Sequence, residues 1–276
     1  MPRDREFDEL VYLRSENRRL RKSLNVLTAP LHVLLKRRGF KIFKQNPSGD
    51  LLLPPDEFLD DYYRKLCRYS FRLFLRDVIK HQDFFRIEHV TRYATADVTS
   101  DYLRYILSAG IVTGTEDGYQ LSRRPVKSFG ETLEWYMAEI FKREFCSESI
   151  WGVKFKRPHV GGDYDVLGKM DGSIVYIEVK SSPPKQVYDA EIAAFLDRVS
   201  DLLPEIAVFF MDTELRMKDK IVPMFEAELS RRHALPPAVA RMEKELFQIE
   251  DRIFIINAKD SIISNMEKVL YRYFRR

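Results

Sequence analysis

The sequence predicts an α/β protein in which a mixed β-sheet domain follows a smaller helical domain and an N-terminal helix. Three patterns among the 276 residues support this prediction. Helix-like and strand-like segments alternate over residues 128–276, which is typical of a partly buried mixed sheet. Residues 51–127 contain helical segments with capping residues, and residues 1–50 begin with a heptad pattern of leucines. We therefore expect three parts, with boundaries near residues 50 and 127.

The composition is that of a folded protein without a disulfide framework. Phe, Tyr and Trp contribute 19, 14 and 2 residues, which is enough to build buried cores. The two cysteines, Cys67 and Cys146, are far apart and lack C-x-x-C spacing, so we expect free thiols and a cytoplasmic location. The charged N-terminus does not resemble a signal peptide, and no stretch approaches the roughly 18 apolar residues of a membrane span. We expect no membrane partner.

A heptad pattern near the N-terminus predicts a coiled-coil helix. The seam positions alternate three and four residues apart, at Leu10, Leu13, Asn17, Leu20, Leu24 and Leu27. Asn17 falls at an a position, where a buried amide favours a parallel two-stranded partner. Glu9 and Glu16 at g positions complement Arg14 and Arg21 at the e positions of a second copy. We therefore predict a homodimer through this helix. The alternative is an amphipathic helix packed on its own domain.

The second segment predicts three helices and a hairpin. We expect helices over Tyr69–Ile79, Ile87–Tyr93 and Ser100–Ala109, with Gly110 ending the third, and a hairpin over Ile111–Leu121. This order resembles the winged-helix family of helix-turn-helix domains. The hairpin tip carries Glu116 and Asp117, which face a phosphate backbone unfavourably. Contact with DNA and a packing or protein-binding role therefore both remain open for this domain.

The third segment predicts the mixed sheet. We expect helices over Gly130–Phe145, 189–202 and 260–274, strands over Ile150–Phe155, Ile206–Met211 and Ile253–Ile256, and a hairpin over 161–182. The charged residues around 212–220 indicate a solvated helix start. The sequence contains no P-loop, no G-x-G-x-x-G and no H-E-x-x-H, so nucleotide hydrolysis, dinucleotide chemistry and zincin proteolysis lack support.

The hairpin over 161–182 has a register that the sequence specifies. Asp171-Gly172 has the composition of a two-residue type I′ turn, which pairs Met170 with Ser173. Paired residue numbers then add up to 343. Strand alternation places four polar side chains on one face: Asp163, Asp165, Glu178 and Lys180. The opposite face carries the apolar residues Val175, Ile177 and Val179.

The polar face of this hairpin suggests a cation site. Asp165 lies directly opposite Glu178 in this register, and two carboxylates in such positions repel each other unless a cation lies between them. Mg²⁺ accepts one or two carboxylates together with water and phosphate oxygens. Lys180, one pleat from Glu178, can stabilise developing negative charge on a phosphate. The alternative is a surface ion-pair network in which Lys180 pairs with both acids.

These residues resemble a known catalytic pattern. Asp165 is followed, thirteen residues later, by Ile177-Glu178-Val179-Lys180, which is similar to the pattern of the PD-(D/E)xK nuclease superfamily, with Tyr164 in place of the proline. The resemblance implies a restriction-endonuclease-like core that uses Mg²⁺ or Mn²⁺. It implies that Asp165, Glu178 and the Val179 carbonyl are metal ligands and that Lys180 is the catalytic lysine.

The resemblance extends to the helix before the sheet. Gly130-Glu131-Thr-Leu-Glu134 fits the superfamily's Gly-x-x-x-Glu helix, which implies a supporting role at the metal for Glu134. Glu131 competes for this role because both lie on one helix face, and the spacing favours Glu134.

The function that these observations predict is a metal-dependent endonuclease that hydrolyses phosphodiester bonds with a metal-activated water. A winged helix ahead of the nuclease core favours DNA over RNA as the nucleic-acid substrate. Two alternatives stay open. The same site acts on RNA, or the chain is a catalytically inactive, dimeric DNA-binding or scaffold protein.

Overall fold

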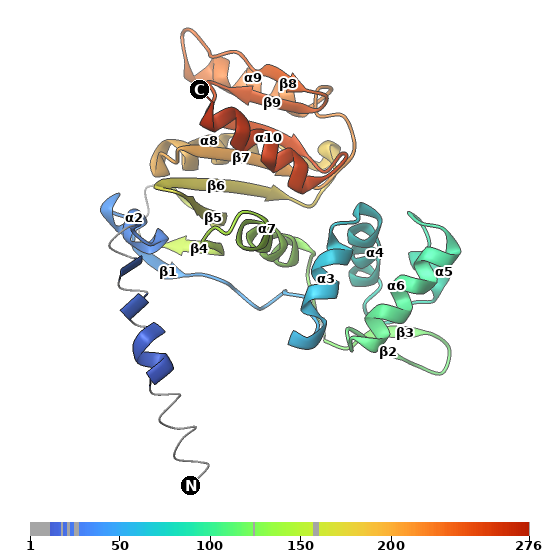
Figure 1. The fold of residues 1–276 in the computed structure, drawn as a ribbon. Helices are drawn as coiled ribbons and strands as arrows, with labels where there is room; N and C mark the ends of the chain where they lie inside the picture. The colour runs from blue at the N-terminus through green and yellow to red at the C-terminus, as the bar shows by residue number, and fades with distance from the viewer. Residues whose placement is uncertain are drawn as a thin grey trace.

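The protein is an α/β protein built on one large mixed sheet. A computed structural model describes residues 12–17, 19–20, 23–24, 28–123, 125–156 and 160–275. Helices cover both faces of the sheet, and a separate group of short helices with a two-stranded hairpin lies beyond one end of its central strands (Figure 1). The predicted α/β class with a mixed sheet is confirmed.

The central sheet has eight strands. Their order is β1 (Ile42–Lys44), β4 (Ser149–Phe155), β5 (Tyr164–Met170), β6 (Ser173–Lys180), β7 (Ile206–Met211), β10 (Ile253–Asn257), β9 (Leu246–Ile249) and β8 (Ala240–Glu243). Strands β4, β5 and β6 form an antiparallel meander, and β7 runs parallel to both β6 and β10. Every residue of β7 is buried, which explains its unbroken apolar sequence.

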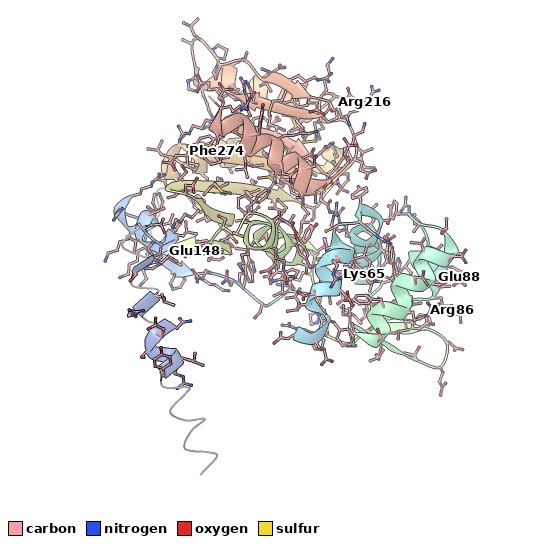
Figure 2. All side chains as sticks on the ribbon, in the orientation of Figure 1. Lys65, Arg86, Glu88, Glu148, Arg216 and Phe274 are labelled. Atoms are coloured by element: carbon pink, nitrogen blue, oxygen red, sulfur yellow. The ribbon has the colours of Figure 1, made fainter. Side chains whose placement is uncertain are left out.

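Two layers of helices bury the faces of this sheet. Helices α7 (Gly130–Glu144) and α10 (Ile262–Phe274) pack on one face, and α2 (Leu31–Arg37), α8 (Asp189–Leu202) and α9 (Ile221–Arg232) pack on the other. Strand β6 shows the alternation, since Val175, Ile177 and Val179 join the α7 layer while Tyr176 joins the α8 layer. The Leu31 N–H at the start of α2 donates a hydrogen bond of 2.8 Å to Oε2 of Glu148, which fixes α2 to the chain before β4. Figure 2 labels Glu148 near α2.

The register predicted for the β5–β6 hairpin is confirmed, but the turn type is wrong. Met170 pairs with Ser173 and Val166 with Ile177, so paired numbers add up to 343. The backbone of Asp171 is left-handed, with φ of 52°, whereas that of Gly172 is not. A type I′ turn needs positive φ at both central residues, so this is another two-residue turn.

The group of helices beside the sheet follows the predicted order of three helices and a hairpin. It comprises α3 (Leu59–Leu66) after a single 3₁₀ turn (Asp56–Phe58), then α4 (Tyr69–Lys80), α5 (Ile87–Val90), α6 (Ala96–Ser108), β2 (Val112–Gly114) and β3 (Tyr119–Leu121). Helix α3 was not expected. Helix α6 begins four residues earlier than predicted because Thr95 caps it and accepts a hydrogen bond from the Val98 N–H. Gly110 has φ of 67°, as expected of a residue that ends a helix.

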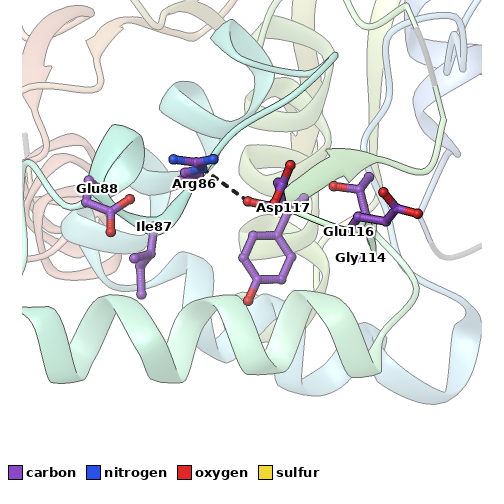
Figure 3. A pocket seen from close by; sticks show the side chains of 9 residues that line it. Arg86, Ile87, Glu88, Gly114, Glu116 and Asp117 are labelled. Carbon is purple, nitrogen blue, oxygen red and sulfur yellow. Dashed lines mark hydrogen bonds between the residues drawn. The ribbon is translucent and has the colours of Figure 1, made fainter.

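The hairpin of this domain folds back on α5. Arg86, just before α5, donates a hydrogen bond of 3.1 Å from Nε to the carbonyl of Asp117 at the hairpin tip, and Glu88 and Glu116 line the same hollow (Figure 3). The tip therefore keeps the acidic character that the sequence indicates. Assignment of this domain to the winged-helix family remains an interpretation.

The N-terminal heptad is described in part. Leu10, Leu27, Glu9 and Arg21 lie outside the described residues. Of the described seam residues, Leu13, Leu20 and Leu24 are 53%, 58% and 58% exposed, so these leucines do not pack on their own domain. The two cysteines are unpaired and exposed. No helix in the described part of the chain is both long and apolar enough to cross a membrane.

Candidate functional site

The hairpin β5–β6 brings Asp165, Glu178 and Lys180 to one edge of the sheet. Strand β5 begins at Tyr164 and the antiparallel strand β6 ends at Lys180, so both ends meet there. The ladder reaches the pair Val166–Ile177. Beyond it, the Asp165 carboxylate accepts a hydrogen bond of 2.7 Å from the Val179 N–H. Asp165 is therefore held against β6 by its side chain.

Glu178 is a buried carboxylate held by two cations. Its side chain is 2% exposed. Nη2 of Arg198, from α8, lies 2.9 and 2.8 Å from the two carboxylate oxygens, and Nζ of Lys180 lies 3.0 Å from Oε1. The Tyr176 hydroxyl also donates to Glu178 and accepts a hydrogen bond of 2.8 Å from Nε of Arg198. These charge-assisted bonds fix the position of Glu178.

Lys180 is largely buried and pairs with two carboxylates. Its side chain is 17% exposed, and its Nζ lies 3.0 Å from Glu178 and 2.8 Å from Glu191 of α8. Burial lowers the pKa of Lys180, but the neighbouring charges of Glu178, Glu191 and Asp165 outweigh this effect and raise it. Lys180 is therefore a fixed cation. The alternative of a surface network with both Asp165 and Glu178 does not match this burial or these partners.

Glu134 of α7 is a buried carboxyl group whose charge interacts with that of Asp165. Burial, followed by the charge of Asp165, raises the pKa of Glu134 to about 9. Burial, followed by the charge of Glu178, raises the pKa of Asp165 well above its usual value. Glu131, by contrast, accepts a hydrogen bond of 2.8 Å from the Asp50 N–H, so its carboxylate is committed to the loop before α3. Glu131 therefore makes a structural contact, and Glu134 as the helix residue at this site stays a prediction.

The predicted position of Asp163 opposite Lys180 is wrong. Asp163 lies before β5, and its carboxylate pairs with Lys154 at 2.9 Å. The chain enters β5 through Gly161-Gly162, where Gly162 has φ of 98°, so the regular alternation does not extend to Asp163.

The chemistry of the donors suits a hard divalent cation. Asp165 and Glu178 supply carboxylate oxygens, and Mg²⁺ needs only one or two carboxylates from a protein. Burial is the main cause of the raised pKa values of Asp165 and Glu134, and the charges of neighbouring carboxylates add to it, so a bound cation would favour the ionised form of both groups. Within the described residues, no group of three or more His, Cys, Asp or Glu side chains is arranged to hold a metal ion. Asp165 and Glu178 therefore match the cation in the chemistry of their oxygen donors, although three such side chains do not converge on one point in the described part of the chain.

Two residues of this site were missed in the sequence. Glu191 and Arg198 lie seven residues apart on α8, so both point toward the end of β6 from one helix face. Arg198 is buried on the apolar side of α8 beside Phe195 and Val199. An arginine within an apolar helix stripe is a signal for a buried carboxylate partner, because an unpaired buried charge is costly.

The fold has solved relatives, although the sequence matches no family model and no curated protein. Can2 from Sulfobacillus thermosulfidooxidans, solved in complex with cyclic tetra-adenylate, is similar with a TM-score of 0.51 and 13% identity over 89% of this chain. Protein VC1899 from Vibrio cholerae has a TM-score of 0.41 and 14% identity over 68% of this chain. The chain spans 60% of the length of Can2 and 53% of VC1899. The first likeness shows a related fold, and the second supports no conclusion.

The raised pKa of Glu134 predicts a pH-dependent stability. A carboxyl group with a usual pKa of 4.5 and a folded-state pKa of about 9 keeps a proton in the folded state that the unfolded state releases. The free energy of unfolding should therefore fall as the pH rises through this interval. Glu134→Gln should make the fall less steep, as measured by urea unfolding at pH 5, 7 and 9 with a chelator present. Equal slopes in both proteins would contradict the assignment.

Proposed function

We propose that the protein is a nuclease that hydrolyses phosphodiester bonds with the help of Mg²⁺ or Mn²⁺. The observation that carries this proposal is the meeting of Asp165, Glu178 and Lys180 at one edge of the sheet, next to Glu134 of α7. Burying the carboxyl groups of Asp165 and Glu134 beside this ion-pair network is costly for stability alone, whereas phosphoryl chemistry needs both a cation site and a positive charge.

Each residue has a distinct role in this proposal. Asp165, Glu178 and the Val179 carbonyl would hold the cation, with Glu134 in support. When bound, the cation supplies Lewis-acid stabilisation of the phosphate and makes water a better nucleophile. Lys180 places its ammonium group where negative charge develops on the phosphate. Glu191 and Arg198 are positioning residues, because Glu191 holds Lys180 and Arg198 holds Glu178.

DNA is the favoured substrate in this proposal. The helices and hairpin before the nuclease-like domain resemble a winged helix, a fold that often contacts DNA. The neighbouring structure of Can2 contains cyclic tetra-adenylate, which is a nucleic-acid-derived ligand of that protein and supports a link to nucleic acids. RNA as the substrate and an inactive scaffold remain the alternatives.

A cleavage panel tests the proposal. The purified chain would be incubated with Mg²⁺ or Mn²⁺ and with supercoiled, linear, single-stranded and branched DNA and with RNA. We expect cleavage that a chelator stops. Asp165→Asn should abolish it and weaken Mn²⁺ binding in calorimetry, while the amide oxygen still accepts from the Val179 N–H. Asp163→Asn, two residues away in an ion pair with Lys154, is the matched control and should stay active. Full activity of Asp165→Asn would contradict the proposed ligand set.

We further propose that the N-terminal helix pairs with a second copy of the chain. The exposed seam leucines Leu13, Leu20 and Leu24 support a partner for this helix, and Asn17 favours a parallel pair. The heptad seam spans only about 18 residues, and isolated helices of this length are weakly stable in water. The helix pair therefore needs a second contact between the two copies to stabilise the dimer. Deleting residues 1–28 should convert a dimer to a monomer in light scattering. A monomeric full-length chain, or a dimer that survives the deletion, would contradict the pairing.

A further inference from the structure

A cleft lies between the helical domain and the sheet edge that carries Lys180. Its volume is about 690 Å³. One wall is α4 with the segment after α5, and the other is formed by the residues that follow β6 and β7. Ser181 and Ser182, which line it, directly follow Lys180 in the chain. The cleft therefore opens at the same edge of the sheet as the candidate site.

Two buried polar atoms on the cleft wall lack hydrogen-bond partners. They are Nε of Arg76 and Oδ2 of Asp77, which are neighbours on α4. Native proteins pair such atoms with few exceptions, and an unpaired one costs about 1–3 kcal/mol. One atom is a donor and the other is an acceptor. A ligand that satisfies both must offer an acceptor and a donor, as a nucleotide does with its phosphate oxygens and its amino or hydroxyl groups.

The cleft also carries exposed cations. Asp212, the most buried acid of the lining, is already paired with Arg72 and Arg76. Lys80 and Arg92 are exposed, and neither forms an ion pair within the described residues. The remaining lining acids are Asp77 and Glu214. Three basic and three acidic residues line the cleft, so a phosphate contact there depends on the two exposed cations, Lys80 and Arg92, and not on net charge.

An aromatic surface completes the cleft. The Tyr93 ring is 44% exposed, and the guanidinium of Arg92 lies 5.3 Å from its centroid. Proteins that bind unpaired nucleic-acid strands combine a basic groove with such rings, on which bases stack. The volume is in the range of small-ligand sites and suits a few nucleotides.

We propose that this cleft binds a few nucleotides of an unpaired nucleic-acid strand and leads that strand to Lys180. Delivery of the strand to Lys180 for cleavage rests on the proposed nuclease function, whereas binding of the strand in the cleft does not depend on it. Lys80 and Arg92 contact phosphates, a base stacks on Tyr93, and Arg76 and Asp77 bond to the same strand from the cleft wall. The substrate of the site is then single-stranded, or is opened to a single strand before cleavage.

The test measures binding of a fluorescent 12-nucleotide DNA strand by anisotropy, with a chelator present to prevent cleavage. Lys80→Ala/Arg92→Ala removes two phosphate contacts, so the slope of log K against log salt should become shallower by about 1.4. Tyr93→Ala should weaken binding about 5- to 150-fold without changing this slope, and Tyr93→Phe should restore it. All three side chains are exposed, so the variants should fold. Lys36→Ala/Arg37→Ala on α2 is the control of equal charge.

Each outcome decides the inference. If the α2 pair weakens binding as much as the cleft pair, net charge explains the affinity and the cleft is not the site. If a mononucleotide binds as tightly as the strand, the cleft holds a free nucleotide and the strand path is wrong. If the cleft variants weaken binding of the strand but the chain cleaves no substrate, this inference stands and the proposed nuclease function is rejected. If the chain cleaves nucleic acid and the cleft variants do not change binding, the nuclease function stands and this inference is rejected.

Discussion

Lys180→Ala is expected to slow phosphodiester cleavage by about 10²–10³-fold while leaving nucleic-acid binding nearly unchanged. The expected size follows from the role of a preorganised charge, because Lys180 is fixed by Glu178 and Glu191 before substrate arrives. A charge held in advance needs no reorganisation when negative charge develops on the phosphate. Single-turnover rates on the best substrate of the cleavage panel, together with anisotropy, would separate chemistry from binding.

The surroundings of Lys180 make this variant interpretable. Glu178 keeps both bonds from Arg198 when the lysine is removed, so its buried charge stays paired. Glu178→Ala does not separate catalysis from stability in this way. It leaves the buried Arg198 guanidinium without its carboxylate and should lower stability as well as activity. Glu191→Gln is the matched variant, since it keeps a hydrogen-bond acceptor for Lys180 but removes the charge, and its effect should be smaller. A wild-type rate in Lys180→Ala would reduce Lys180 to a structural ion-pair partner.

The register of the β5–β6 hairpin was predictable because strand period and a two-residue turn leave little freedom. The pairing of Val166 with Ile177 follows from them alone. The same rule failed at Asp163, because glycines before β5 end the regular strand. Residues that approach from another element, such as Arg198, cannot be placed by strand alternation. Their position depends on how α8 packs, which is a tertiary property.

The region after β7 likewise depends on tertiary packing that the sequence pattern does not reveal. The charged stretch 212–220 indicates a solvated helix start, yet Asp212 is fully buried and the helix α9 begins at Ile221. The sequence gives no sign of burial because the partners of Asp212, Arg72 and Arg76, lie about 140 residues earlier on α4. Strands β8 and β9 were also missed. They are short, and much of β8 is exposed, so hydrophobic periodicity is weak there.

Asp212→Ala is expected to destabilise the protein by about 3–5 kcal/mol. The Asp212 and Arg72 side chains are 0% and 1% exposed, and Nε and Nη2 of Arg72 lie 2.9 and 2.8 Å from Oδ1 of Asp212. Arg76 pairs with Oδ2. Removing the carboxylate would leave the Arg72 guanidinium buried without its partner, which is the costly way to break such a pair. Urea unfolding without divalent cations measures the loss.

Two comparisons separate burial from charge. Asp260→Asn removes the charge of an exposed partner of Lys244 at a left-handed backbone position that Asn tolerates, and should leave the unfolding midpoint unchanged. Arg72→Met/Asp212→Leu replaces the fully buried pair by apolar groups and should recover part of the stability lost in Asp212→Ala, because the only charge left without its carboxylate among these residues is that of Arg76, whose side chain is 20% exposed. A loss of stability in Asp212→Ala no larger than that in Asp260→Asn would contradict the assignment. Because the pair joins α4 to the end of β7, the apolar double variant also tests whether those charges only stabilise the junction. If they do, it should still bind the DNA strand in the cleft.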